Sequence, residues 1–222
     1  MKIYQVEISN YCNLSCSYCP HPSQKRKKGF MTFENFKKVV ALAKKCGQTL
    51  LYLHNFGEVL IHPHLAEFIN YAHKKGVQCS FYTNGVLFTE ELIKDLYNAG
   101  LRRISVSNHV KDADIVVKEL IRKANVPMVI DEVYTVSLRH NWAGQIEDTE
   151  CDYVCKNNPS PCIFQRENAI VVLWNGDISA CCIDCEGISV KNTIEDLLRE
   201  EYVFRGSELC KSCDLMRGDE NL

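Results

Sequence analysis

Three cysteines near the start of the chain have a spacing that suits metal chemistry. The run Cys12-Asn-Leu-Ser-Cys16-Ser-Tyr-Cys19 places them on one short loop. Thiolates are the usual protein ligands of iron–sulfur clusters, and three of them can hold three irons of a four-iron cube. The fourth iron then lacks a protein ligand, and an open metal position is where substrate or cofactor chemistry occurs. The alternatives are a zinc site closed by His21 and three unrelated buried thiols.

A second group of cysteines lies in the last third of the chain. Cys162 and Cys181 flank a strand–turn–strand pattern, and Cys210-Lys-Ser-Cys213 follows a predicted short helix. Four thiolates from a hairpin and a tail can close a cluster completely. A structural zinc ribbon would use the same four side chains. The ligand set stays open, because Cys182 could replace Cys181 and because Cys151 or Cys155 could supply a ligand.

The composition favours metal sites over disulfides. The chain has 222 residues and 13 cysteines, an odd number that excludes complete internal pairing. The net charge of −2 gives no basic footprint for a nucleic-acid partner. Apolar runs such as 170–174 are too short to cross a bilayer, and the charged first residues do not form a signal peptide. We therefore expect a soluble, cytoplasmic protein with no nucleic-acid or membrane partner.

The elements that must position these cysteines alternate along the first 136 residues. Apolar patterns predict strands over 2–9, 49–56, 77–83, 103–107 and 126–136. Helical patterns between them cover 33–46, 65–73, 89–100 and 113–124, with Thr32 at the N-cap of the first. This alternation predicts a parallel sheet in an open or partial barrel. Chemistry in such sheets takes place at the carboxyl ends of the strands, where the cysteine loop follows the first strand.

The pattern changes after about residue 138. Residues 140–166 are polar and show no clear period, and residues 169–174 and 178–183 then predict a hairpin around a turn at 175–177. Thr193 and Asp196 form a capping box that opens a helix to about residue 201. We expect a barrel core over 1–137 and a metal-binding region over 138–222.

The segment from Glu7 to Pro20 resembles the signature of radical S-adenosylmethionine (radical SAM) enzymes, whose cysteine loop follows the first strand of a partial (β/α)6-type barrel. The resemblance extends over residues 3–136. Phe56-Gly57-Glu58 resembles the Gly-Gly-Glu segment that contacts the methionine amino group, with Phe56 in place of the first glycine. Tyr18 matches the aromatic residue beside the adenine. The resemblance also implies contacts to the ribose or carboxylate of SAM by Thr83, Asn84 and Ser107.

The resemblance implies an activity as well as a fold. An open iron held by Cys12, Cys16 and Cys19 would chelate SAM, and one electron from the [4Fe–4S] cluster would cleave a C–S bond. The 5′-deoxyadenosyl radical would then abstract a substrate hydrogen. The family also implies an electron donor such as a flavodoxin or ferredoxin. Such radical chemistry belongs to the cofactor, while the protein supplies positioning and excludes water.

The C-terminal cysteines resemble the SPASM/twitch appendage of radical SAM enzymes in its short form. Pro161-Cys162, the run from Trp174 to Cys182 and the final Cys210-Lys-Ser-Cys213 carry this likeness. It implies two [4Fe–4S] clusters in all, one SAM-binding and one auxiliary held by Cys162, Cys181, Cys210 and Cys213. The expected reaction on a small-molecule or peptide substrate is a two-electron oxidation, as in the twitch-type dehydrogenase of deoxy-scyllo-inosamine. An epimerase or peptide-modifying enzyme is the rival within the family, and a non-enzymatic zinc-binding module is the rival outside it.

Other polar residues have a functional and a structural interpretation. One of the cysteines outside the two ligand sets could return a hydrogen atom, although spare cysteines more often pack as small hydrophobic residues: Cys151, Cys155, Cys182 and Cys185. The basic run 25–28 could clamp a phosphate or carboxylate, although such runs are usually solvated. A further set could accept a proton, bind substrate or simply pack: His54, His62, His64, Asp131, Glu132 and Tyr134.

Overall fold

The computed structural model describes residues 1–135, 142–145, 162–200, 202–204, 206–211 and 213. Six strands lie in the first part of the chain: β1 (Lys2–Val6), β2 (Leu50–Tyr52), β3 (Gln78–Ser80), β4 (Tyr82–Thr83), β5 (Arg103–Ser107) and β6 (Val129–Tyr134). Four helices alternate with them: α1 (Phe33–Lys45), α2 (Leu65–Lys74), α3 (Glu90–Ala99) and α4 (Ala113–Ala124). Short 3-10 turns η1 (His21–Ser23) and η2 (Val59–Ile61) lie in the loops after β1 and β2.

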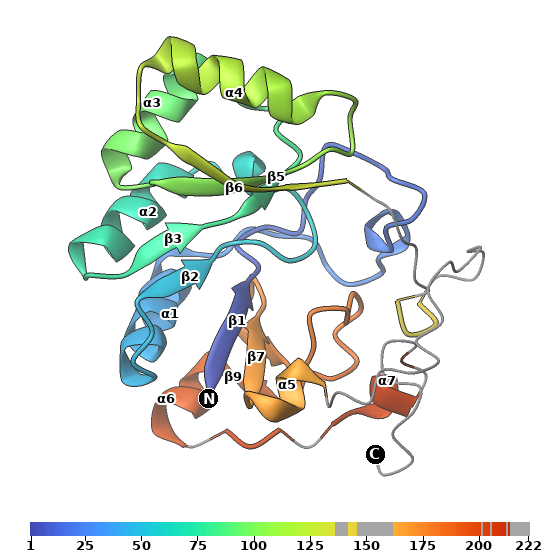
Figure 1. The fold of residues 1–222 in the computed structure, drawn as a ribbon. Helices are drawn as coiled ribbons and strands as arrows, with labels where there is room; N and C mark the ends of the chain where they lie inside the picture. The colour runs from blue at the N-terminus through green and yellow to red at the C-terminus, as the bar shows by residue number, and fades with distance from the viewer. Residues whose placement is uncertain (136–141, 146–161, 201, 205, 212, 214–222) are drawn as a thin grey trace.

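The predicted partial barrel of parallel strands is confirmed. β2 pairs with β3, and β5 pairs with β4 and β6, all in parallel. Helices α1 to α4 pack side by side on the outside of this arc (Figure 1). Because every crossover runs through a helix, the carboxyl ends of the strands meet at one rim of the barrel.

The strand predicted over 77–83 is divided in two. Residues 78–80 bond to β2, whereas Tyr82 and Thr83 bond to β5. Phe81 between them is fully buried, and its carbonyl accepts a hydrogen bond from Ser105 N at 2.8 Å. The chain therefore changes partner at Phe81, a choice that no local pattern encodes.

The first strand ends at Val6 rather than at residue 9. Glu7 and Ile8, which follow it, are at most 1% exposed, because both faces of the chain are covered at this point. The strand predicted over 49–56 stops at Tyr52, which leaves residues 53–58 free to form the loop that carries Gly57.

The helices follow the sequence closely, since their ends are set by local caps. The side chains of Thr32 and Thr89 accept hydrogen bonds from Asn35 N and Leu92 N. Gly100 ends α3 in a left-handed conformation. Phe36 and Phe68 stack at 4.3 Å in the core between the helices and the sheet.

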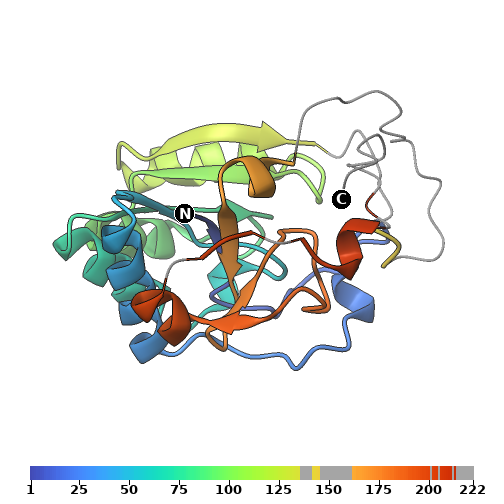
Figure 2. The same cartoon turned by 90° about the horizontal axis from the view of Figure 1, so that it is seen from below.

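The C-terminal segment continues the barrel sheet. Strand β7 (Ala169–Val172) lies parallel beside β1 and forms the predicted hairpin with β8 (Asp177–Ser179), which pairs with β9 (Asn192–Thr193). The capping box of Thr193 and Asp196 opens α6 (Ile194–Arg199). Helices α5 (Ile163–Arg166) and α7 (Glu208–Lys211) lie near the two ends of the segment. Figure 2 shows α6 beside α1 on one side of the molecule and α7 on the other side.

The two predicted regions are therefore joined by sheet hydrogen bonds and by α6. The boundary between 137 and 138 lies outside the described residues and stays a prediction. In the described part of the chain, no helix is long and apolar enough to span a membrane.

Candidate active site

A cavity of 470 Å³ opens at the carboxyl ends of the barrel strands. The structure brings all of the residues predicted for the first site to its wall. These are Cys12, Cys16, Tyr18, Cys19, Phe56, Gly57, Glu58, Thr83, Asn84 and Ser107. They come from the loops after β1 and β2 and from the ends of β4 and β5, so the parallel topology assembles the cavity from distant segments.

The cysteine loop presents three free, half-buried thiols to this cavity. Cys16 O accepts from Cys19 N at 3.1 Å, and Cys12 Sγ accepts from Leu14 N at 3.5 Å. Burial raises the pKa of Cys19 to about 11 and also raises the pKa of Cys12. The thiols of Cys12 and Cys19 are therefore protonated at neutral pH, and a metal centre that binds them must displace their protons. Across the described residues, no three His, Cys, Asp or Glu side chains are arranged to hold a single metal ion.

Glu58 connects two strand ends beneath the cavity. Its carboxylate accepts from Thr83 Oγ1 at 2.6 Å, from Asn84 N at 2.9 Å and from Leu60 N at 3.1 Å. Burial raises the pKa of Glu58, although these hydrogen bonds act in the opposite direction. Asn84 in turn donates through Nδ2 to Asn13 Oδ1 at 2.8 Å, inside the cysteine loop. Glu58 therefore organises the rim of the site.

Gly57 allows the loop after β2 to touch the end of β1. Its φ is +101°, and a Cβ atom there would lie 2.7 Å from the carbonyl oxygens of Ser9 and Tyr11. No side chain fits at this close approach. The neighbouring Phe56 is 4% exposed, and its ring centroid lies 5.5 Å from that of Trp142.

Two residues that sequence patterns did not indicate join the site. His109 Nδ1 lies 2.7 Å from the Tyr18 hydroxyl, and Trp142 Nε1 donates to Tyr18 O at 2.9 Å. Both line the cavity. Trp142 lies in the stretch 140–166, which shows no periodicity, and a lone tryptophan there does not indicate its contacts. For His109, the only sequence signal is its position two residues after Ser107.

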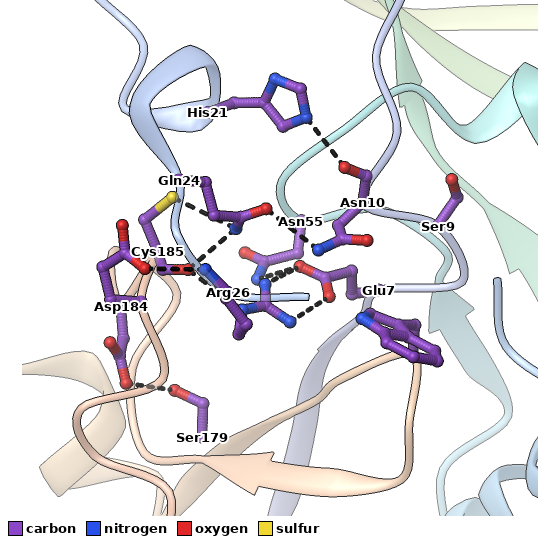
Figure 3. Close-up of polar contacts among 12 residues, drawn as sticks. Glu7, Ser9, Asn10, His21, Gln24, Arg26, Asn55, Ser179, Asp184 and Cys185 are labelled. Carbon is purple, nitrogen blue, oxygen red and sulfur yellow. Dashed lines mark hydrogen bonds and ion pairs between the residues drawn. The ribbon is translucent and has the colours of Figure 1, made fainter. Parts of the chain in front are cut away.

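Within the basic run 25–28, Arg26 is neither solvated nor placed to clamp a ligand in the cavity. The Arg26 guanidinium forms two hydrogen bonds, at 2.8 and 2.7 Å, with the carboxylate of Glu7, whose side chain is fully buried (Figure 3). None of residues 25–28 lines the cavity. The pair is instead part of the packing between the cysteine loop and the C-terminal segment.

The histidines divide between the cavity and the core. His54 lines the cavity, accepts from Tyr82 N at 3.3 Å, and has a pKa lowered to about 3 by burial. His21 also lines it, with Nε2 at 2.8 Å from Asn10 O and a buried Nδ1 that has no hydrogen-bond partner. His62 is buried against Met31 O, and His64 is exposed.

Of the polar residues predicted on β6, only Tyr134 lines the cavity. The Tyr82 hydroxyl donates to the Glu132 carboxylate. Burial and Glu132 raise the pKa of Tyr82 to about 12. Asp131 forms an exposed ion pair with Arg103 at 3.4 Å.

The second predicted ligand set also gathers in one place. Cys162, Cys181, Cys210 and Cys213 line a cavity of 20 Å³, and its other walls are apolar: Ala180, Ile183, Phe204 and Leu209. The space is about that of one water molecule, so a bound cluster would have to push the four side chains apart.

Of the remaining cysteines, Cys182 lies nearest to this pocket, because it packs against both the cluster that contains Cys213 and the cluster that contains Phe164. Cys185 is fully buried, with its Sγ 3.3 Å from Gln24 Nε2. Cys79 is buried in β3, and Cys46 packs at the end of α1. Pro161, Cys151 and Cys155 lie outside the described residues.

Comparison with known proteins gives a consistent pattern. The profile of the Radical SAM superfamily matches residues 6–135. A tungsten-containing aldehyde ferredoxin oxidoreductase cofactor-modifying protein of Pyrococcus furiosus is 30% identical over 111 residues, which are 50% of this chain and 31% of that protein. The chain spans 27% to 43% of the length of the curated relatives that it matches first.

Two solved structures share the fold. The crystal structure of BtrN in complex with AdoMet and 2-DOIA superposes with a TM-score of 0.69 at 21% identity, over 90% of this chain and 85% of BtrN. Streptococcus suis SuiB bound to its precursor peptide SuiA superposes with a TM-score of 0.52 at 13% identity, over 95% of this chain and 69% of SuiB. At these identities the likeness describes the fold alone.

Proposed function

The chain belongs to the radical SAM superfamily, and on that premise we propose that it binds SAM at a [4Fe–4S] cluster in the barrel cavity and oxidises its substrate by two electrons. The observation that carries this proposal is that three free thiols line the same cavity as Glu58, from the loop after β2, and Thr83, at the end of β4. When bound, the cluster and SAM supply a 5′-deoxyadenosyl radical, which takes a hydrogen atom from the substrate.

The cysteine loop would hold three irons through Cys12, Cys16 and Cys19. The donor set fits such a cluster, because the three thiols face one cavity that is large enough for a ligand. A closed zinc site with His21 is the alternative that the iron and zinc content of the reconstituted protein distinguishes.

The rim of the cavity would position SAM. Glu58 is occupied by its bonds to Thr83, Asn84 and Leu60, so we assign it the role of fixing the loop whose residues 56–57 face the ligand. Tyr18 and Ser107 line the same cavity and would contact the nucleoside part. Because the hydrogen bond of the Tyr18 hydroxyl goes to His109, the ring is held in one orientation.

The four-thiol pocket supports one auxiliary [4Fe–4S] cluster. Its thiols come from the hairpin, from the residue before α5 and from the tail, and no other cysteine among the described residues lines it. A completely ligated cluster can accept the electron that a substrate radical loses, which favours oxidation.

The epimerase alternative needs a thiol that faces the substrate. In the described part of the chain, the thiols at the barrel cavity are the three assigned to the first cluster, and Cys185 is fully buried away from it. The substrate class, a small molecule or a peptide, the flavodoxin or ferredoxin donor and the cytoplasmic location are proposed from the family resemblance.

The experiment is anaerobic reconstitution followed by reduction with dithionite in the presence of SAM. We expect a brown protein with about eight irons per chain that releases 5′-deoxyadenosine. A colourless protein that holds zinc instead would show a non-enzymatic metal-binding module. With a turned-over substrate, loss of two hydrogens by mass indicates dehydrogenation, whereas uptake of one solvent deuterium without other mass change indicates epimerisation.

A further inference from the structure

Trp142 lies between the two cysteine sites. It lines the barrel cavity, and it also packs against the small cluster formed by Ala143, Ile183, Leu209 and Cys213. Cys213 and Ile183 line the four-thiol pocket, so one side chain borders both sites.

On the barrel side, Trp142 makes two contacts that shape the cavity. Its indole N–H donates to the carbonyl of Tyr18, which lies between Cys16 and Cys19, at 2.9 Å. Its ring lies against Phe56 at 5.5 Å and 55°. Phe56 stands where the family resemblance expects a glycine, and this aromatic pair therefore fills space at the loop proposed to face SAM.

On the other side, the segment that carries Trp142 is fixed to the loop after Cys182. Gln145 accepts hydrogen bonds from Cys185 N at 2.9 Å and from Glu186 N at 3.2 Å, and it donates to Ile183 O at 2.7 Å. Gln145 also donates to Trp142 O at 2.6 Å. A shift of residues 183–186 would therefore move Trp142.

The same loop is held from the cysteine loop of the barrel (Figure 3). Gln24 Nε2 and Arg26 Nε both donate to Cys185 O, at 2.8 and 3.1 Å. Gln24 also accepts from Asn10 Nδ2 at 3.0 Å at the base of the cysteine loop. Residues 183–186 thus lie in one hydrogen-bonded unit with the first site, two residues after Cys181 of the second.

We propose that Trp142 is a positioning residue for SAM and that the four-thiol pocket holds it in place, so that the state of the auxiliary site sets the affinity of the barrel cavity for SAM. This inference rests on the proposed function. The coupling is reciprocal by thermodynamic linkage, and bound SAM must therefore raise the affinity of the auxiliary site for its iron.

The test is a double-mutant cycle on the reconstituted holoprotein, with the SAM dissociation constant measured by equilibrium dialysis. Trp142→Phe keeps a ring against Phe56 but removes the N–H donor, and a hydrogen bond of this kind is worth about threefold to tenfold in affinity. We expect Cys213→Ala to weaken SAM binding by a similar factor. The double variant should bind no more weakly than the weaker single variant, because both changes act through one contact.

Trp174 provides a matched control, because the chain has only two tryptophans. Its indole N–H also donates to a backbone carbonyl, that of Lys27 at 3.2 Å, but it does not line the cavity. Trp174→Phe should leave SAM affinity unchanged. In that background Trp142 is the single tryptophan, and its emission, excited selectively over that of the tyrosines, should shift when SAM is added and when Cys213→Ala removes auxiliary iron. This readout needs no turnover and no change at Trp142.

The outcomes separate the two levels of inference. If the wild-type holoprotein neither binds SAM nor forms 5′-deoxyadenosine, the proposed function fails. If it does both, but the effects of Trp142→Phe and Cys213→Ala multiply, or Cys213→Ala leaves SAM affinity and Trp142 emission unchanged, the coupling alone is overturned.

Discussion

The barrel and the C-terminal segment are held together by different means. The barrel has one continuous apolar core, with side chains such as Phe36, Phe68 and Phe81 fully buried between sheet and helices. Beyond β6, residues of β7, β8 and α6 join this same core, whereas the loops around the four thiols pack in two additional clusters of four buried residues each, one of which includes Cys213. Asp184 is fully buried there and accepts bonds from Ile188 N, Ser189 N and Ser189 Oγ at 2.6 to 2.8 Å.

This difference indicates what each region needs in order to fold. The apolar core of the barrel is large enough to fold without a metal, whereas clusters of four residues supply little hydrophobic free energy. Metal binding contributes directly to folding where the core is small. We therefore expect the part of the C-terminal segment around the four thiols to depend on its cluster, and the barrel, with β7, β8 and α6 packed on it, to need a cluster only for its chemistry.

The largest expected effect is on activity and concerns the barrel. Cys16→Ala should reduce 5′-deoxyadenosine formation by at least about 1,000-fold, because losing a thiolate ligand removes the first cluster. The thermal unfolding of the barrel should change little. Cys46→Ala, at the end of α1 and away from both cavities, is the control and should retain activity. Equal loss in both variants would contradict the assignment.

Loss of the auxiliary site should affect the other region. Cys213→Ala should lower the iron content by about four per chain. Hydrogen exchange at the amides of residues 180–190 should accelerate at least about 100-fold, since a metal-dependent segment opens locally. Amides in α1 to α4 should keep their protection. Unchanged iron content would show that Cys213 is not a ligand, and loss of protection in both regions would show that they fold as one unit.

The interface between the cysteine loop of the barrel and the C-terminal segment can be tested through Glu7. Glu7→Gln leaves the Arg26 charge, whose side chain is 13% exposed, without its partner. Breaking a buried ion pair in this way costs about 3–5 kcal/mol. Urea unfolding measures the loss, and Glu34→Gln, which removes the exposed pair with Lys37, should have no measurable effect. Similar urea midpoints for the two variants would show that this interface contributes little to the free energy of unfolding.

The close approach at Gly57 should have a somewhat smaller effect. Gly57→Ala combines a left-handed backbone with contacts of 2.7 Å, which should destabilise the barrel by about 2–4 kcal/mol. Gly47 has a φ of +69° but open space around it, so Gly47→Ala should cost only about 1 kcal/mol. Chemical denaturation distinguishes these values, and equal costs would mean that the loop can move away from β1.

The smallest expected effect is the pH dependence due to His54. Burial lowers its pKa to about 3, so between pH 3 and 6.5 the unfolded chain binds more protons than the folded one. Stability therefore rises with pH over this range and is flat above it. From pH 6.5 to 5.5, His54→Asn should lose about 1 kcal/mol less stability than the wild type. The exposed His64 is the control, and a slope that His64→Asn reduces as much would contradict this origin.

Local chemistry explains which features could be predicted from the sequence. Thr32, Thr89 and Gly100 define helix ends through contacts within one turn, so the helices follow the predicted bounds. The cysteine spacings led to two sets of thiols, and each set lines one cavity. The division at Phe81 could not be predicted, because it depends on the partners that two strand halves find in space.

The contacts between the barrel and the C-terminal segment could not be predicted for the same reason. Arg26 lies in a basic run that looks solvated, and only the fold places it against Glu7 and Cys185 O. Trp142 lies in a stretch without periodicity, and its neighbours Tyr18 and Phe56 are more than 80 residues away in the chain. Contacts of this kind follow from packing, which a single sequence does not display.

The central claim is that the three thiols of the barrel leave one iron open to SAM. Electron–nuclear double resonance on the reduced protein, with SAM labelled by 15N at its amino group, tests it most directly. At saturating SAM, we predict a 15N coupling to the cluster in the wild type and in Cys213→Ala, and none in Cys16→Ala. A reduced barrel cluster that shows no coupling to the label, or that is ligated by a fourth protein side chain, would contradict the account.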